Sequence, residues 1–173
     1  MKKIIEKIKR IEKIEEETER LNLQVRELQN KKLKTIIEVT KDKFEYSPIY
    51  KERLFIYGNH FEYFKNKNGE CVKGVCICTE VIKYDEDKYG TYIEQNELFL
   101  LEDGQLKVFK EIIQTDDCIN TQDVYTRELI ENYDISEFYI NDITENINIL
   151  LEEKVIDLTT ILNIEKDKLE YLK

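Results

Sequence analysis

The stretch TYIEQNELFLLEDGQLKVFKEI, residues 91–112, decides the fold because it reads as two strands joined by a tight turn. Residues 91–101 and 106–112 are rich in the aromatic and aliphatic side chains that are typical of strands. Asp103-Gly104 between them favours the positive φ angles of a hairpin turn. The stretch therefore predicts an antiparallel hairpin.

The residues before this hairpin continue the β pattern. A polar turn at residues 85–90 leads back to a further strand, and Asn68-Gly69 is a second hairpin turn. A short β-branched segment also precedes Pro48, which interrupts the pattern. The aromatic runs at residues 54–57 and 61–64 together form one predicted strand region, residues 72–84 form the next strand, and residues 35–40 form a short connecting strand. We therefore expect an antiparallel meander of four to five strands.

Beyond Asp116 the spacing of apolar residues becomes helical. It predicts a helix at 123–132, a longer one at 136–153, and one or two short helices at 157–172. The fold class expected is therefore α+β. Residues 155–169 have the rhythm of a helix-turn-helix centred on an asparagine, but their mixture of acids and lysines does not suit a DNA-recognition helix.

The chain opens with a long amphipathic helix that no Gly or Pro interrupts. Aliphatic residues fill six of eight seam positions of a heptad repeat, with Lys7 and Thr18 at the other two. The expected oligomerisation residues are Ile4, Ile11, Ile14, Leu21, Val25 and Leu28. We interpret residues 1–33 as an oligomerisation helix and residues 34–173 as a separate body, in a homodimer or higher oligomer. Alternatively, the helix folds back onto its own body.

Charge is spread unevenly along the chain. Residues 1–43 carry a net charge of +4, whereas residues 44–173 carry −14. An acidic body repels nucleic-acid phosphates and attracts a basic protein surface. The expected partner-binding acidic face consists of Asp85, Glu86, Asp87, Glu94, Glu97, Asp116 and Asp117. The alternative is an acidic surface that only keeps the protein in solution.

The cysteines are the strongest candidates for chemistry. Cys76 and Cys78 fall at alternate positions of a predicted strand, which predicts two small core residues on one face. A zinc site that also uses Cys71 is an alternative, although the spacing lacks the usual knuckle. A thiol nucleophile would need a base, and His60 is the sole histidine. Cys118 lies far from the others along the chain.

No sequence motif indicates an enzyme or a cofactor. The five glycines are scattered singly, so neither a phosphate-binding loop nor a dinucleotide fingerprint is present. A small-ligand binding protein is the leading alternative function, with an aromatic pocket. The residues expected to line it are Phe61, Tyr63, Tyr84 and Tyr92.

The N-terminus lacks the uninterrupted apolar run of a signal peptide, which predicts a cytoplasmic protein. Abundant Ile, Lys, Glu and Asn without any Ala indicate an AT-rich genome, such as that of a phage or mobile element. We therefore expect a non-enzymatic inhibitor whose acidic face blocks a basic nucleic-acid-processing or defence protein. A DNA-binding regulator or a small enzyme is less well supported.

Overall fold

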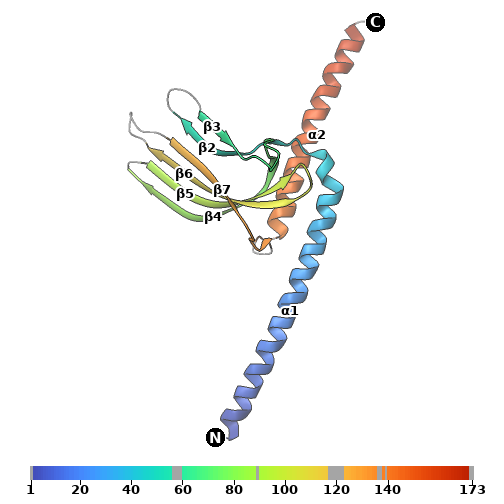
Figure 1. Cartoon of the computed structure of the whole chain (residues 1–173). Coiled ribbons are helices and arrows are strands. Elements are labelled where there is room, and N and C mark those ends of the chain that lie inside the picture. The colour runs from blue at the N-terminus through green and yellow to red at the C-terminus, as the bar shows by residue number, and fades with distance from the viewer. Residues whose placement is uncertain are drawn as a thin grey trace. The chain divides into compact units, whose positions relative to one another are not determined.

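The N-terminal helix and the rest of the chain form separate compact units in the computed structural model of the protein. Residues 1–39 make the first unit and residues 40–173 the second. The structure describes residues 2–55, 60–88, 90–116, 123–135, 138 and 140–171. The elements, in chain order, are α1 (Lys2–Thr40), a short 3₁₀ helix η1 (Lys41–Lys43), β1 (Ser47–Pro48), β2 (Tyr50–Phe55), β3 (His60–Tyr63), β4 (Lys73–Asp87), β5 (Gly90–Leu101), β6 (Leu106–Asp116), β7 (Asp123–Ile130) and α2 (Ile140–Tyr171) (Figure 1).

Helix α1 is longer than the sequence pattern predicted. It runs without a break to Thr40, so the strand expected at residues 35–40 is wrong and the predicted boundary at residue 33 lies inside the helix. Extending an existing helix needs no new nucleation, so even β-branched residues are added to it readily. Thr35 donates a hydrogen bond from its hydroxyl to the carbonyl of Lys31, 3.0 Å away, within the helix.

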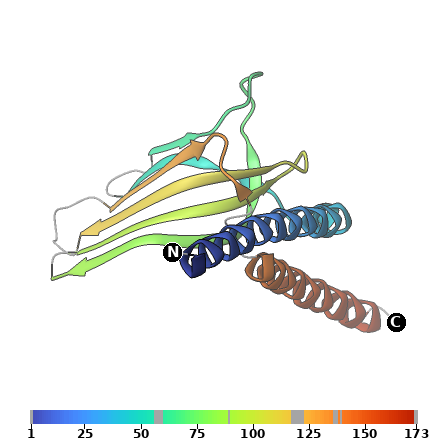
Figure 2. The same ribbon diagram turned by 90° about the horizontal axis from the view of Figure 1, so that it is seen from below.

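The body is built on one antiparallel sheet that is nearly barrel-shaped (Figures 1 and 2). The α+β prediction is confirmed, but the sheet has seven strands and not four to five, in the order β1-β4-β5-β6-β7-β2-β3. Strands β4 to β7 form a meander, and the β2–β3 hairpin joins it at β7. The order of the strands in the sheet therefore differs from their order along the chain.

Strand β7 lies where a helix was predicted at 123–132. It pairs with β6 on one side and β2 on the other, so its backbone groups are used by two neighbours. The Glu and Leu residues of this segment favoured a helix in the sequence prediction, whereas Val124, Tyr125 and Thr126 favour a strand. Pairing with both neighbouring strands outweighs the weak local preference.

The two predicted glycine turns are confirmed. Gly69 and Gly104 have φ angles of 81° and 83°, which side chains other than glycine adopt at a cost. Gly104 donates its N–H to the carbonyl of Leu101 at 2.8 Å, and Gly69 donates to Asn66 at 3.0 Å. These turns fix the register of the strands that follow them.

The sheet has two faces, which we name by β5. The inner face carries Phe99 and Leu101, which form a buried cluster with Ile49 and Phe109. The outer face carries Leu98, which pairs with Val108 in register and is fully buried. Each strand contributes alternate residues to the two faces, so every strand of the meander serves both.

Helix α2 packs against β4 at the outer face. Its first half buries Ile143 and Ile147. The helix runs unbroken from Ile140 to Tyr171, so the division predicted between a helix at 136–153 and one or two short helices at 157–172, with a turn at Asn163, is wrong. No Gly or Pro lies in this range to end the first helix.

Candidate interaction surfaces

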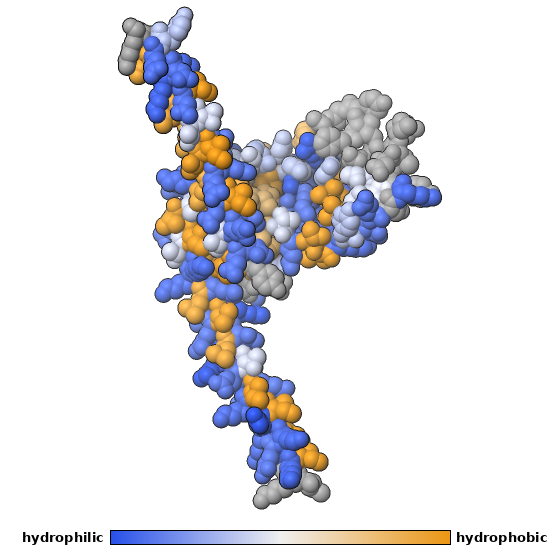
Figure 3. Space-filling view, turned by 180° about the vertical axis from the view of Figure 1, so that it is seen from behind, coloured by the Kyte–Doolittle hydropathy of each residue, from blue (hydrophilic) through white to orange (hydrophobic). Residues whose placement is uncertain are grey.

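The predicted seam of α1 lies on an exposed stripe of the helix. Its six aliphatic residues, Ile4, Ile11, Ile14, Leu21, Val25 and Leu28, are between 49% and 67% exposed. Figure 3 shows apolar side chains in orange along this helix. Ile5, Ile8 and Leu23 are also exposed outside the seam. This exposed aliphatic stripe is a candidate surface for association.

A second exposed apolar stripe, on α2, was missed from the sequence. Its aliphatic members are Leu151, Val155, Leu158, Leu162 and Leu169. Alternate spacings of four and three residues place them on one helix face. Glu165 occupies the position of this pattern between Leu162 and Leu169. All but Leu151 are more than half exposed, and Leu151 is half-buried. The heptad spacing was present in the sequence, but the assumed turn at Asn163 divided it.

Four of the predicted acidic residues lie at one end of the sheet. Asp85 and Glu86 are exposed on β4, and Glu86 accepts a hydrogen bond from the hydroxyl of Tyr84. The backbones of Asp87 and Asp116 lie on either side of Gly90, in β4 and β6. Asp117 lies outside the described residues. The structure thus brings together four of the seven acids predicted for the acidic face.

The other two predicted acids have partners within the sheet. Glu94 pairs with Lys110 at 2.6 Å, and this hydrogen bond is the main cause that lowers the pKa of Glu94. Glu97 is buried on the inner face. Its assignment to an exposed acidic face is therefore wrong, because alternation along β5 turns it inward beside Phe99.

The register reveals another set of acids on the outer face, which we call the outer carboxylates. They are Glu52, Glu62, Glu80, Glu94 and Glu128. Glu52 and Glu62 lie directly opposite each other on β2 and β3, an arrangement of like charges that costs free energy. Lys83 and Lys110 are the basic residues in the same rows. These rows of the outer face therefore hold five carboxylates and two lysines.

The inner face holds a buried cluster around Arg127. Its Nε lies 2.6 Å from Glu97 Oε2, and its Nη2 lies 2.9 Å from Glu111 Oε1. Gln95 donates from Nε2 to Glu111 Oε2 at 2.6 Å. The guanidinium carbon also lies 4.2 Å from the centre of the Tyr50 ring, which is a cation–π contact. No sequence pattern indicated this cluster, because its members come from four separate strands.

Burial and charge shift the pKa values in this cluster. Burial first, and then the negative charge of Glu97, raises the pKa of Glu111, while Arg127 and Gln95 act against the rise. Burial alone would lower the pKa of Arg127, but Glu97 and Glu111 raise it above its ordinary value. The arginine is thus permanently charged, and the cluster is a structural ion-pair network with satisfied partners.

The predicted aromatic pocket does not form as expected. Phe61 and Tyr63 lie on edge strand β3 with their rings 6.3 Å apart, and Phe61 pairs with inner-face Arg53. Tyr92 pairs with Asp85 and lies on the outer face, where Lys83 contacts its ring. Tyr84 is exposed. The four side chains therefore do not line one pocket.

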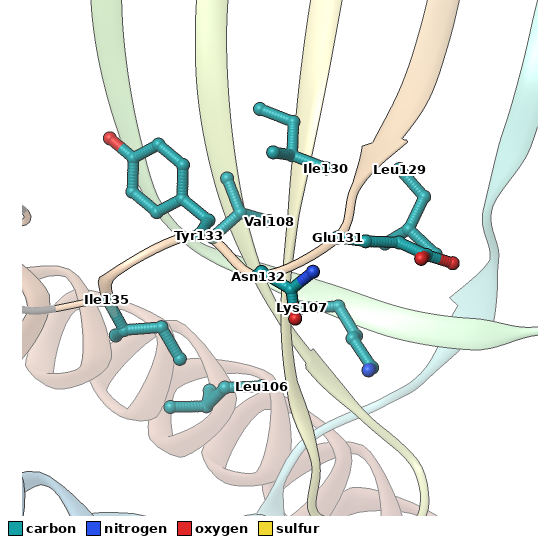
Figure 4. A pocket seen from close by; sticks show the side chains of 9 residues that line it. All are labelled: Leu106, Lys107, Val108, Leu129, Ile130, Glu131, Asn132, Tyr133 and Ile135. Carbon is teal, nitrogen blue, oxygen red and sulfur yellow. The ribbon is translucent and has the colours of Figure 1, made fainter.

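A pocket of about 320 Å³ lies instead between the start of β6 and the end of β7 (Figure 4). Leu106 and Ile135 lie on one side of it and Lys107 and Glu131 on the other. Asn96 donates a 3.3 Å hydrogen bond from Nδ2 to the hydroxyl of Tyr133, another lining residue. Aliphatic side chains and the polar side chains of Lys107, Glu131, Asn132 and Tyr133 together line this pocket.

The cysteines do not share one face of β4. Cys76 lies opposite Phe99 and Cys78 opposite Leu98, because Ile77 is an extra residue that forms a β-bulge. Cys76 therefore belongs to the inner face and Cys78 to the outer face, so the predicted common face is wrong. Burial raises the pKa of Cys76 to about 11 and also raises that of Cys78. Thiols with raised pKa values are poor nucleophiles.

The structure also bears on the other chemical candidates. The described residues include no group of three or more His, Cys, Asp or Glu side chains that could hold a metal ion. His60 lies in edge strand β3, and its backbone pairs with that of Leu54 in β2. Cys118 lies outside the described residues. Among the described residues, no helix is both long and apolar enough to span a membrane.

In comparisons of the chain with protein-family models, with curated proteins and with solved structures, nothing matches.

Proposed function

We propose that the protein is a non-enzymatic, homo-oligomeric interaction protein. Helix α1 joins copies of the chain through its seam, and the acidic body binds and inhibits a basic partner, as a phage or mobile-element inhibitor would. The observation that carries the proposal is the exposure of all six aliphatic seam residues of α1. The basic partner would be a nucleic-acid-processing or defence protein.

Self-association would bury the aliphatic residues of the α1 seam. Burying an aliphatic side chain contributes about 1.5 to 3 kcal/mol, and each copy offers six of them. An isolated helix depends on such packing for most of its stability. Pairing of two α1 helices would therefore stabilise both the helix and the assembly.

Replacement of Ile11 and Ile14 together with Asp tests this role of α1. The two charges would lie in the seam, where their burial is costly, so the variant should have a lower molar mass by light scattering. If the variant keeps the mass of the native protein, α1 is not the oligomerisation helix.

A matched control is provided by Ile5→Asp together with Leu23→Asp. These residues are 50% and 57% exposed on the same helix but lie outside the seam. They undergo the same chemical change, with the same effect on net charge. The control should keep the native mass, and equal loss of mass in both variants would point to general damage to the helix.

The outer carboxylates support the proposed recognition of a basic partner. Five carboxylates and two lysines share the rows of this face, so it is net acidic. A cationic group of a partner would reduce the repulsion between the opposed carboxylates of Glu52 and Glu62. Electrostatic complementarity of this kind accelerates association and weakens with salt.

Capture from a bacterial lysate at low and moderate salt tests this recognition. A basic protein should be retained at low salt, released at moderate salt, and lost when Glu52, Glu62 and Glu128 are all changed to Gln. The same changes at exposed Glu102, Glu131 and Glu145 give an equal net charge and should keep the partner. Equal capture by both variants would exclude the outer face as the binding surface.

A small-ligand binding protein is the alternative proposal. The pocket between β6 and β7 is its best support, since polar and apolar groups both line it and Tyr133 in its lining is hydrogen-bonded to Asn96. Mass spectrometry of the purified protein under native conditions distinguishes the two functions. A co-purifying small molecule would favour the ligand-binding function.

A further inference from the structure

We propose that the far half of α2, residues 151–171, is a second self-association surface that binds the same segment of a second copy in antiparallel orientation. The surface is distinct from the α1 seam; only the expected number of copies in the assembly rests on the proposed function of α1. Its occupant is α2 of a second copy, and the case for this occupant rests on the seam pattern and on charge.

The α2 seam consists of Leu151, Val155, Leu158, Leu162, Glu165 and Leu169. It extends beyond the part of α2 that buries Ile143 and Ile147, and it spans about 27 Å at 1.5 Å per residue. Val155, Leu158, Leu162 and Leu169 are 62%, 55%, 53% and 57% exposed. A regular leucine seam of this kind is the pattern by which helices pair.

Antiparallel pairing matches the seam with itself. Leu158 would face Leu162 of the second copy, and Leu151 would face Leu169. A twofold axis near Thr160 would generate each of these contacts twice. Glu165 would face Val155. Parallel pairing would instead place Glu165 against Glu165 inside the seam, where like charges repel.

The residues beside the seam favour the same orientation. Glu152 would face Lys166 of the second copy, an attractive pair that the twofold axis repeats. Ile161 would face Ile161 and bury apolar surface that is now 55% exposed. In the parallel arrangement neither contact would form.

One like-charged contact accompanies this arrangement, between Lys154 and Lys168 of the second copy. Both lysines already have carboxylate partners within their own chain. Lys154 pairs with Glu45, and Lys168 pairs with Glu165 at 2.6 Å. These partners offset the repulsion between the lysines.

Two independent surfaces would let the protein form assemblies larger than a dimer. Light scattering of the full chain should therefore show more than two copies. Leu158→Asp together with Leu162→Asp should reduce the mass by about half or more, by removing one of the two interfaces. Ile156→Asp with Ile164→Asp is the matched control, because these exposed residues lie on α2 outside the seam.

The outcome is separable from that of the α1 experiment. If the α2 variant keeps the native mass, the second surface is wrong, whatever the α1 variant shows. If the α2 variant loses mass while Ile11→Asp with Ile14→Asp does not, the α2 surface stands and the role of α1 fails. Loss of mass in the α2 control would overturn the assignment of the seam.

Disulfide cross-linking tests the orientation. Leu158→Cys and Leu162→Cys would be introduced in separate chains that carry Cys71→Ser, since Cys71 is exposed. Antiparallel pairing predicts a cross-linked dimer when the two variants are mixed and oxidised, and little when each is oxidised alone. Cross-linking of each variant with itself would show parallel pairing and overturn the proposal.

Discussion

Arg127 Nε on β7 lies 2.6 Å from Glu97 Oε2 on β5, on the inner face of the sheet and across the intervening strand β6. Strand β6 adds Glu111, whose Oε1 forms an ion pair with Arg127 Nη2 at 2.9 Å. One guanidinium therefore links three neighbouring strands. The side chains of Arg127, Glu97 and Glu111 are only 10%, 7% and 4% exposed, so water cannot replace a lost partner.

Glu97→Gln should destabilise the protein strongly. Glu97 receives two hydrogen bonds from Arg127, and removal of its charge leaves a buried arginine with one carboxylate. Glu111 still balances the charge of Arg127, so the cost is that of the weakened charge-assisted hydrogen bonds to Glu97, roughly 1.5 to 3 kcal/mol in the free energy of unfolding. Urea denaturation measures the loss. Glu94→Gln, the same change on the same strand but in the more exposed pair with Lys110, should cost much less, and equal losses would contradict the argument.

Glu111→Gln should change how stability depends on pH. The pKa of Glu111 is raised in the folded protein, so the folded state keeps this proton at pH values where the unfolded chain has lost it. The contribution of Glu111 to stability is therefore full below its ordinary pKa of 4.5 and declines as the pH rises through the raised value. The free energy of unfolding of the variant should lack this decline as the pH rises above 4.5. An unchanged slope would show that Glu111 is ionised normally.

Gly74→Ala should destabilise the inner cluster by overpacking. A Cβ at this position would lie 2.8 Å from Ile49 Cδ1 and 3.1 Å from a ring carbon of Phe99. Overpacking of a core costs about 1 to 3 kcal/mol in the free energy of unfolding. Ile49→Val removes the nearest atom, so the double variant should lose less stability than the sum of the single changes. Strict additivity in urea denaturation would argue against this contact.

The elements that the sequence predicted well are those with strong local signals. The turns at Gly69 and Gly104 need positive φ angles, and the α1 heptad extends over 25 residues without Gly or Pro. Strand β7 could not be recognised in this way, since Asp123–Ile130 is specified by its neighbours β6 and β2. Local preference is weak beside such pairing.

Among the candidate surfaces, too, those set by local spacing could be predicted, and those set by the register of several strands could not. The α1 seam was readable because helical spacing places its residues on one face whatever the rest of the chain does. The Arg127 cluster needs the register of four strands, and a single extra residue at Ile77 moves Cys76 and Cys78 to opposite faces. A one-residue change of register reverses the faces of a strand, and composition alone does not reveal it.

The bulge at Ile77 leads to a prediction about thiol reactivity. Cys71 is exposed, whereas burial raises the pKa of Cys76 to about 11 and Cys78 is buried on the other face. At pH 8 few Cys76 thiols are ionised, and the thiolate is the form that reacts. Iodoacetamide should therefore modify Cys71 first in the folded protein, and Cys76 and Cys78 only after urea is added. Peptide mapping by mass spectrometry assigns each site, and equally fast modification of Cys76 without urea would mean that β4 opens readily.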